Sequence, residues 1–481
     1  MSGKTTDNHL YYQSPLEGRY ASQAMRQLFG PQRKFSTWRR LWLALAECEK
    51  KLGLNITDKQ LQQMAEHLDD IDFEAAGNYE KKLRHDVMAH IHAFGDVAPD
   101  ARAIIHLGAT SQFVNDNTDL LLMHEGLDLL IGYLVNVIDS LGQFAQRYRD
   151  LPCLAFTHYQ AAQLTTVGKR ATLWCYEFVM DLEELEYRRD HLRLRGVKGT
   201  TGTQASFMAL FNGDHERIKA LDRMVAEKMG LPVTYTVTGQ TYSRKVDAAL
   251  VGSLAGLAAT VHKLANDLRL LANLKEVEEP FEAEQVGSSA MAYKRNPMRC
   301  ERATGLARWL MDISVSPLHT AAEQWFERTL DDSSNKRLAI PEAFLTADAM
   351  LQIVLNVVQG LVVYPKTIAA HVSAELPFIA TENILMAGVQ AGGDRQDLHE
   401  RIRAHSQAAG QVVKAEGKPN DLLERLKKDP AFAGVDVDRL LEPSDYVGRA
   451  PQQVEEFLSA HVEPVRRKYA HRLGQKADLK V

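Results

Sequence analysis

The sequence predicts an all-α protein of three domains, with long helices in a central bundle and shorter helices on either side. No proline occurs between Pro99 and Pro152, between Pro152 and Pro232, or between Pro232 and Pro280, so each interval can hold a long helix. Within these intervals apolar residues recur every three or four positions, as in helices that bury one stripe. Alternation typical of a strand is limited to the short segment 233–237.

Four long helices are expected in the central region. The first carries an apolar stripe from Leu120 to Leu141, and the second covers residues 164–195. The third covers residues 244–274. The fourth runs from about Pro341 to Val363, with Pro341 in its first turn, where proline is tolerated. Long helices of this kind are typical of an elongated bundle.

The flanking regions are expected to hold shorter helices with local caps. Ser36 is placed to cap a helix that ends at Lys51, and Thr57 with Gln60 forms a capping-box pattern. We therefore place domain boundaries near residues 111 and 364. The predicted domains are an N-terminal helical domain (1–111), a central bundle (112–364) and a C-terminal helical domain (365–481).

Composition excludes several classes of function. The 481 residues carry a net charge of −5 and 45% apolar residues, which gives no reason to expect a nucleic-acid or membrane partner. We identify no apolar run long enough for a bilayer, no signal peptide at the polar N-terminus and no C-terminal targeting signal, so a cytoplasmic location is expected. The four distant cysteines are expected to be buried thiols rather than metal ligands: Cys48, Cys153, Cys175 and Cys300.

The segment Gly287–Pro297 is the most unusual in the chain. It is a small polar loop between two helical regions, with two serines after the glycine and then Lys294 and Asn296. Such a loop can place a weak base, a cation and an amide around an anionic substrate. On composition alone, a simple connection between helices is the competing interpretation.

Three further segments contain candidate functional residues. His158 follows Thr157 in a segment that we expect to open a helix, and a histidine there can act as acid or base. Arg84–Asp86 is a compact, oppositely charged cluster, and Arg328–Arg337 groups arginines and hydroxyls that suit phosphate or carboxylate, although a solvated surface would look similar in both cases. The glycine-rich segment 199–204 could hold an anion through backbone N–H groups but lacks a nucleotide-binding spacing. The histidine spacing in 85–92 does not match a metal motif.

These segments together resemble the fumarase/aspartase superfamily. Gly287–Pro297 is similar to its signature loop, GSSxMPxKxNP, which is long and specific. Other superfamily regions are matched by Gly108–Ser111, Thr157–Gln160 and Gly239–Thr241. Ser14–Tyr20, Arg84–His90 and Ser333 with its flanking arginines resemble the adenylosuccinate lyase family in particular. The similarity extends over almost the whole chain.

The resemblance implies a fumarase/aspartase-like fold whose long helices form the core of a homotetramer, with active sites shared between subunits. It implies nucleotide substrates in purine biosynthesis. One reaction would split adenylosuccinate into AMP and fumarate, and the other would release fumarate from succinylaminoimidazole carboxamide ribotide. No metal or organic cofactor is expected.

The resemblance also implies roles for individual residues. Ser288 would be the base, with Lys294 stabilising its oxyanion, and His158 the acid, oriented by Glu301. Residues expected to hold the succinyl part are His85, Thr110, Ser111, Gln240, Lys294 and Asn296. Residues expected to hold the phosphate and nucleotide end are Arg19, Tyr20, Arg328, Ser333 and Arg337. Other expected substrate-binding residues are Arg84, Asp86, Thr157, Ser289, Met291 and Arg302.

Two positions depart from the family pattern. Ala292 and Ala161 stand where the family normally has proline, so φ is freer and an N–H is added at each position. A sister lyase acting on argininosuccinate, or a fumarase, is one alternative, but neither needs the phosphate pocket that the arginine clusters indicate. A catalytically silent structural paralogue is another, against which the intact Ser288, His158 and Lys294 argue.

Overall fold

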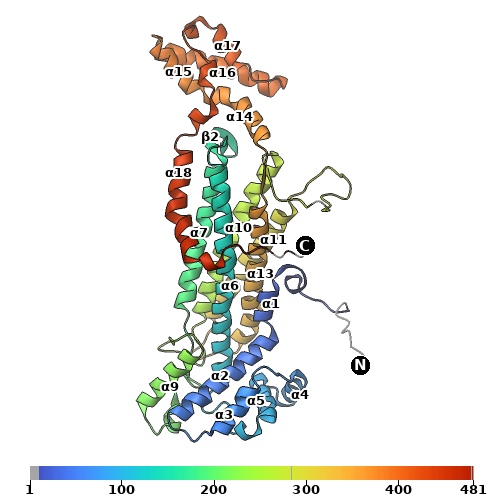
Figure 1. Ribbon diagram of the computed structural model, residues 1–481, viewed down its shortest axis with the longest axis vertical. Coiled ribbons are helices and arrows are strands. Elements are labelled where there is room, and N and C mark those ends of the chain that lie inside the picture. The colour runs from blue at the N-terminus through green and yellow to red at the C-terminus, as the bar shows by residue number, and fades with distance from the viewer. Residues whose placement is uncertain (1–9, 283, 478, 480–481) are drawn as a thin grey trace.

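The computed structural model describes residues 10–282, 284–477 and 479, and it confirms the all-α prediction. Long helices run along the long axis of the molecule, with short helices gathered at each end (Figure 1). N-terminal helices occupy one end, and a small helical unit of residues 380–446 occupies the other, with its own apolar core. The expectation of a polar N-terminus falls mostly on residues 1–9, which lie outside the described part of the chain.

Five long helices form the bundle, and their apolar stripes meet in one large core. The bundle consists of α6 (Ser111–Arg147), α7 (Val167–His191), α10 (Lys245–Asn273), α11 (Met298–Ile313) and α13 (Asp331–Gln359). The predicted stripe from Leu120 to Leu141 lies in α6, and both of these leucines are buried. The helices predicted over 164–195 and 244–274 correspond closely to α7 and α10.

The predicted starts of two helices were wrong. Helix α13 begins at Asp331, ten residues before Pro341, so the proline lies inside the helix and not in its first turn. Helix α2 (Pro31–Lys51) begins with Pro31 after the N-cap Gly30, and Ser36 is buried within it. In both cases a competing start signal decided the boundary: acidic residues 331 and 332 in the first turn of α13, and proline at the first position of α2.

A β-hairpin connects α6 to α7, where the sequence predicted the opening of a helix. Strand β1 (Pro152–Thr157) pairs antiparallel with β2 (Gln160–Thr166), and His158 and Tyr159 form the two-residue turn. Both turn residues have positive φ, 53° and 56°. This conformation is uncommon outside glycine, asparagine and aspartate, which explains why residues 158–159 carry no hairpin signal. The predicted alternation at 233–237 produces only an isolated bridge at Thr234.

Shorter elements complete the fold. The capping box predicted at Thr57 and Gln60 is confirmed at the start of α3. The N-terminal elements are a π-helical turn (Leu16–Tyr20), α1 (Gln23–Leu28), α2, α3 (Asp58–Glu66), α4 (Phe73–Leu83) and α5 (Asp86–Val97). Within the central region lie α8 (Ala205–Leu210), α9 (His215–Lys228), β3 (Val277–Glu278), α12 (Val315–Ala322) and β4 (Val362–Val363). The C-terminal elements are α14 (Pro365–Ile379), α15 (Thr381–Gln390), α16 (Arg395–Glu416), α17 (Leu422–Lys428), α18 (Ala450–Phe457) and α19 (Glu463–Lys468).

The chain returns to the bundle at its C-terminal end. Val454, Leu458 and Val462 join the large central core beside α6 and α7. The boundaries predicted near 111 and 364 coincide with the starts of α6 and α14, and the division into three domains stays a prediction. All four cysteines are buried free thiols, as predicted.

Three bundle helices are long and apolar enough to cross a membrane by length and composition, which the sequence analysis did not anticipate. Their most apolar windows are 78% buried in α6, 56% in α10 and 83% in α13. These apolar residues face other helices of the bundle, so the core of the fold accounts for most of their hydropathy. Helix α10 leaves the largest share of its window uncovered in the single chain.

Candidate active site

A polar cleft of about 660 Å³ lies where α5, α6 and α13 begin. It brings together seven of the residues that the sequence singled out, although they come from distant parts of the chain. These are Arg84, His85, Asp86, Ser111, Arg328, Ser333 and Arg337. Thr110 precedes Ser111 as the N-cap of α6, and Gln240 accepts a hydrogen bond from Arg328 at 3.1 Å.

The start of each of these three helices contributes first-turn residues to the cleft wall: Asp86 from α5, Ser111 from α6 and Ser333 from α13. The N-terminus of a helix has unpaired N–H groups and a partial positive charge, so it favours an anion. Arg84 and Arg337 add full positive charges. The cleft is therefore built to receive an anionic group.

Local structure fixes the orientation of His85 and Asp86. The backbone N–H of Met88 donates to Nδ1 of His85 at 3.3 Å, so a single ring proton would be on Nε2. Nε2 lies 3.4 Å from Oγ of Ser111. Asp86 accepts a hydrogen bond from Arg337 at 2.7 Å. Burial opposes ionisation of Asp86, but the hydrogen bond and charge of Arg337 outweigh it and hold the pKa of Asp86 below its usual value.

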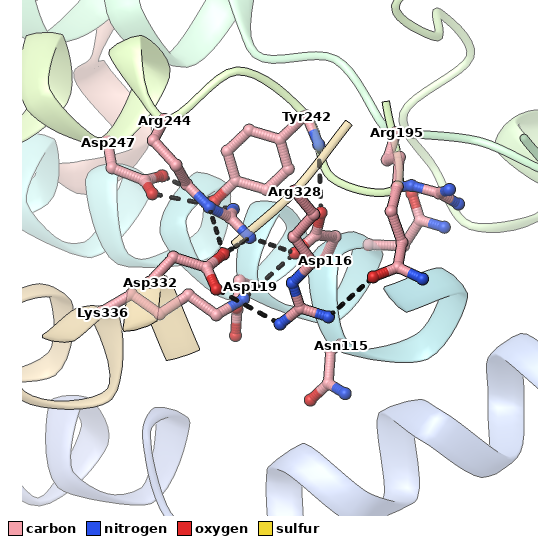
Figure 2. Close-up of polar contacts among 12 residues, drawn as sticks. Asn115, Asp116, Asp119, Arg195, Tyr242, Arg244, Asp247, Arg328, Asp332 and Lys336 are labelled. Carbon is pink, nitrogen blue, oxygen red and sulfur yellow. Dashed lines mark hydrogen bonds and ion pairs between the residues drawn. The ribbon is translucent and has the colours of Figure 1, made fainter. Parts of the chain in front are cut away.

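Behind the cleft lies a buried network of ion pairs between α6, α10 and α13 (Figure 2). Arg244, at the start of α10, donates to Asp332 at 2.6 Å and to Asp116 at 2.9 Å, and all three side chains are fully buried. Lys336 donates to Asp116 at 3.0 Å. Burial opposes ionisation of Asp116, but Arg244 and Lys336 lower its pKa to about 2. Figure 2 shows Arg328 at the edge of this network.

The Gly287–Pro297 loop lies near the other end of the bundle, between α10 and α11, and projects from it (Figure 1). Oγ of Ser288 accepts the backbone N–H of Met291 at 3.1 Å, and Nδ2 of Asn296 donates to the carbonyl of Gly287 at 2.8 Å. A Cβ at position 287 would lie 2.3 Å from the carbonyl oxygen of Lys294, so only glycine fits there. Most of the loop is exposed, including Ser289, Met291 and Lys294.

Arg19, Tyr20 and Arg302 form a second cationic group. The guanidinium carbons of Arg19 and Arg302 both lie 5.9 Å from the centre of the Tyr20 ring. Arg302 is in the first turns of α11, directly after the signature loop, and Glu301 precedes it. The structure thus places the nucleotide-binding candidates Arg19 and Tyr20 beside α11, away from the cleft that holds Arg328, Ser333 and Arg337.

The hairpin holds the third group, Thr157 and His158. His158 is exposed at the tip of the hairpin, in a backbone conformation that costs energy and is enriched at functional sites. Among the described residues, no hydrogen bond or ion pair joins His158 to Glu301 or to Ser288. A single chain therefore assembles the cleft but leaves the proposed acid, the proposed base and the cleft apart.

Sequence reasoning missed several residues of the cleft and its surroundings, among them Gln112, Asn115 and Lys34. Gln112 and Asn115 are buried polar side chains in its wall, and Asn115 points away from the ion network in Figure 2. The spacing could have found Asn115, because it follows Ser111 by four residues and shares its helix face. Burial lowers the pKa of Lys34 on α2, which lies near Arg337 in the fold. No sequence signal pointed to Lys34.

Comparisons with known proteins agree on one family. A family model described as "Lyase" matches residues 44–311, and one described as "Adenylosuccinate lyase C-terminus" matches residues 377–457. The adenylosuccinate lyases of Schizosaccharomyces pombe and Saccharomyces cerevisiae are each 56% identical over 456 residues, which cover 94% of this chain and 95% of theirs. That of Schistosoma mansoni is 47% identical over 98% of this chain and 99% of its own.

Solved structures with much lower identity share the fold. The 3-carboxy-cis,cis-muconate lactonizing enzyme of Pseudomonas putida superposes with a TM-score of 0.80 at 22% identity, over 94% of this chain and 99% of that one. A fumarate lyase from Mesorhizobium gives a TM-score of 0.79 at 24% identity, over 94% and 100%. At these identities the likeness concerns the fold alone.

Proposed function

This chain belongs to the adenylosuccinate lyase family, and we propose that it releases fumarate from adenylosuccinate and from succinylaminoimidazole carboxamide ribotide by β-elimination. A base removes a proton from the succinyl carbon next to a carboxylate. The bond between the neighbouring carbon and nitrogen breaks, the electron pair stays on nitrogen, and an acid returns a proton to it. The products are fumarate and the nucleotide whose nitrogen has regained its hydrogen, an amine from adenylosuccinate and a primary carboxamide from succinylaminoimidazole carboxamide ribotide.

The observation that carries this proposal is the cleft at the starts of α5, α6 and α13. Two sources of positive charge meet there, the helix N-termini and the exposed arginines, and they suit the phosphate and carboxylates of a succinylated nucleotide. Arg337 is half-exposed, which leaves its remaining N–H groups free to reach a ligand. Argininosuccinate and malate lack a phosphate, so a sister lyase or fumarase would not need a phosphate pocket.

We assign the proton transfers to the loop and the hairpin. Ser288 is the base, and its oxyanion would gain stabilisation from the N–H of Met291, which already donates to Oγ, and from the charge of Lys294. His158 is the acid because imidazole titrates near neutral pH. Glu301 would orient His158 by accepting its other ring proton.

We further propose that each active site is completed by other copies of the chain, in a homotetramer. Ser111 begins α6, and the hairpin with His158 follows its other end. The 37 residues of α6 span about 55 Å at 1.5 Å per residue, too far for both residues to reach one substrate. Exposed apolar side chains on α7, including Leu173, Tyr176 and Met180, give a second copy a surface to cover.

The direct test is loss of ultraviolet absorbance when adenylosuccinate is mixed with the purified protein, together with measurement of fumarate. Release without added metal is expected. No release, or inactivation by a chelator that a divalent metal reverses, would overturn the proposal. A silent paralogue would bind the substrate without releasing fumarate.

Sharing of sites has its own test. His158→Ala and Ser288→Ala proteins, each inactive, are mixed under conditions that exchange subunits. Some mixed sites then draw wild-type residues from different chains, so part of the activity should return. If the mixture stays inactive after exchange has been demonstrated, for example with differently tagged subunits, the sites are not shared.

A further inference from the structure

We propose that Asp332 is a positioning residue for substrate binding, which acts by holding the guanidinium of Arg328 at the wall of the cleft. Asp332 lies in the first turn of α13 and is fully buried, so it cannot touch a ligand in the cleft. Arg328 lies one turn earlier, in the loop that leads into the helix. The inference rests on the proposed function, in which Arg328 contacts the anionic substrate.

The two oxygens of Asp332 connect Arg328 to the most deeply buried cation of the network. Oδ2 accepts two hydrogen bonds from Arg244, at 2.9 Å from Nε and 2.6 Å from Nη2. Oδ1 accepts one from Nη2 of Arg328 at 3.2 Å. Both donors of Arg244 converge on Oδ2, which anchors this oxygen and leaves Oδ1 to accept from Arg328.

Two glutamines hold the opposite side of the Arg328 guanidinium. Oε1 of Gln240 accepts from Nη1 at 3.1 Å. The side-chain oxygen of Gln112 accepts from Nη1 at 2.8 Å, in the amide orientation that also lets its nitrogen donate to Asp116 at 3.0 Å. Arg328 is thus held from both sides before any substrate binds, as electrostatic preorganisation requires.

The backbone around Arg328 explains why these side chains are needed. Arg328 is not in a helix, and its neighbours Trp325 and Phe326 are exposed. The loop is anchored through its backbone, since Gln240 donates its N–H to the carbonyl of Glu327 at 3.0 Å. A Cβ at Gly239 would lie 2.5 Å from that same carbonyl oxygen, so the two loops meet closely. The backbone contacts fix the position of the main chain at Arg328, and the side-chain hydrogen bonds fix the position of its guanidinium.

The variant Asp332→Asn separates positioning from simple charge effects, because the two predict opposite results. Removing a carboxylate makes the cleft more positive, so Coulomb attraction alone predicts tighter binding of an anionic substrate. Positioning predicts weaker binding, because Arg328 loses its fixed direction. We expect KM for adenylosuccinate to rise by at least about tenfold, the scale of one charged hydrogen bond, with kcat changed less than about threefold.

Asp119→Asn is the matched control. Asp119 belongs to the same network and pairs with Lys336 at 2.6 Å, but among the described residues no hydrogen bond or ion pair joins it to Arg328. Asp119→Asn removes the same charge as Asp332→Asn, so KM for adenylosuccinate should stay unchanged or fall. If both variants change KM equally and in the same direction, charge and not position is responsible, and the inference is wrong.

The double variant Asp332→Asn with Arg328→Ala tests the route of the effect. If Asp332 acts through Arg328, the double variant binds substrate no worse than Arg328→Ala alone. Additive losses would overturn the positioning role. If Arg328→Ala alone leaves KM unchanged, the substrate contact assigned to Arg328 fails, which is a separate result from failure of Asp332.

Gln112→Met keeps the test decisive if Asp332→Asn does not fold. It removes one of the two glutamine acceptors on the other side of Arg328 without changing any charge, and methionine has a similar volume. We expect a KM increase of about threefold or more, comparable to one neutral hydrogen bond, in protein with wild-type circular dichroism and subunit assembly. An unchanged KM in folded Gln112→Met would contradict preorganisation of Arg328.

Discussion

The cleft and the Gly287–Pro297 loop are constructed in opposite ways. Behind the cleft, Asp116, Arg244 and Asp332 are fully buried and satisfy one another's charges, so the wall facing the substrate is fixed in the single chain. In the loop, Met291 is 58% exposed and Tyr293 is 90% exposed. The substrate-binding end is thus prepared in advance. The loop that carries the proposed base is exposed, and we expect it to close when substrate and the other subunits of the proposed assembly are in place.

The largest expected effect comes from removing the proposed reacting groups. Ser288→Ala and His158→Ala should each lower kcat by at least ~10²-fold, the low end for a positioned acid or base. Affinity for substrate should be nearly unchanged, because these groups act on protons and add little ground-state contact. The measurements are kcat, KM, and exchange of the β-carbon proton of the substrate with deuterium.

Ser289→Ala is the matched control for the base, one residue away in the same loop. It should lower kcat less, through loop geometry alone. If Ser288→Ala still exchanges the β-carbon proton at the wild-type rate while Ser289→Ala does not, the base is Ser289 and the loop is arranged differently from our assignment.

In the cleft, Arg337→Ala should weaken binding with little effect on kcat. Losing a charged hydrogen-bond partner costs roughly 2–4 kcal/mol in such sites. The test compares adenylosuccinate with the corresponding nucleoside, which lacks phosphate. Wild type should prefer the nucleotide, and Arg337→Ala should lose most of this preference. Equal penalties on both substrates would mean that Arg337 serves the fold through its ion pair with Asp86.

The same contrast explains what the sequence could predict. The long helices were predictable because their apolar spacing is local, and several cleft residues stood out as charged clusters. The ion network was not predictable, because Asp116, Arg244 and Asp332 are distant in sequence and each is an ordinary charged residue by itself. The hairpin was missed because His158 and Tyr159 adopt positive φ without glycine. In the proposed assembly, the joint position of the base, acid and cleft depends on other copies of the chain, whose arrangement one sequence does not describe.

Glu49 tests what burial does to a carboxyl group that lacks such a network. Its side chain on α2 is fully buried, and neither carboxylate oxygen has a partner among the described residues. Burial raises the pKa of Glu49 from 4.5 to about 8. Between these values the unfolded chain releases the proton while the folded chain keeps it, so the free energy of unfolding falls as pH rises.

In the wild type, Glu49 should make the free energy of unfolding roughly 2–3 kcal/mol lower at pH 7 than at pH 5, since one pKa unit corresponds to about 1.36 kcal/mol. Glu49→Gln should remove this difference. The measurement is urea unfolding at both pH values and fixed protein concentration. Glu47→Gln is the control, because Glu47 pairs with Lys228. If the wild type and Glu49→Gln lose stability equally between pH 5 and pH 7, Glu49 is ionised in the folded state.

The smallest expected effect concerns Ala292 in the loop. The N–H of Lys294 donates to the carbonyl of Met291 at 3.0 Å, which makes Ala292 the second residue of a β-turn. Proline is favoured at that position because it fixes φ near −65°, and the φ of Ala292 is not among the positive values. Ala292→Pro should reduce the freedom of the loop before it closes, by about 0.4–1 kcal/mol, so kcat should change by about two- to fivefold. The melting temperature should barely move, since the exposed loop contributes little to the core.

Ala290→Pro is the contrasting variant, because it removes an N–H that donates to Oγ of Ser288 at 3.4 Å, and it should lower kcat. If Ala292→Pro shifts the melting temperature and leaves kcat unchanged, the loop is already rigid, and the contrast with the cleft does not hold.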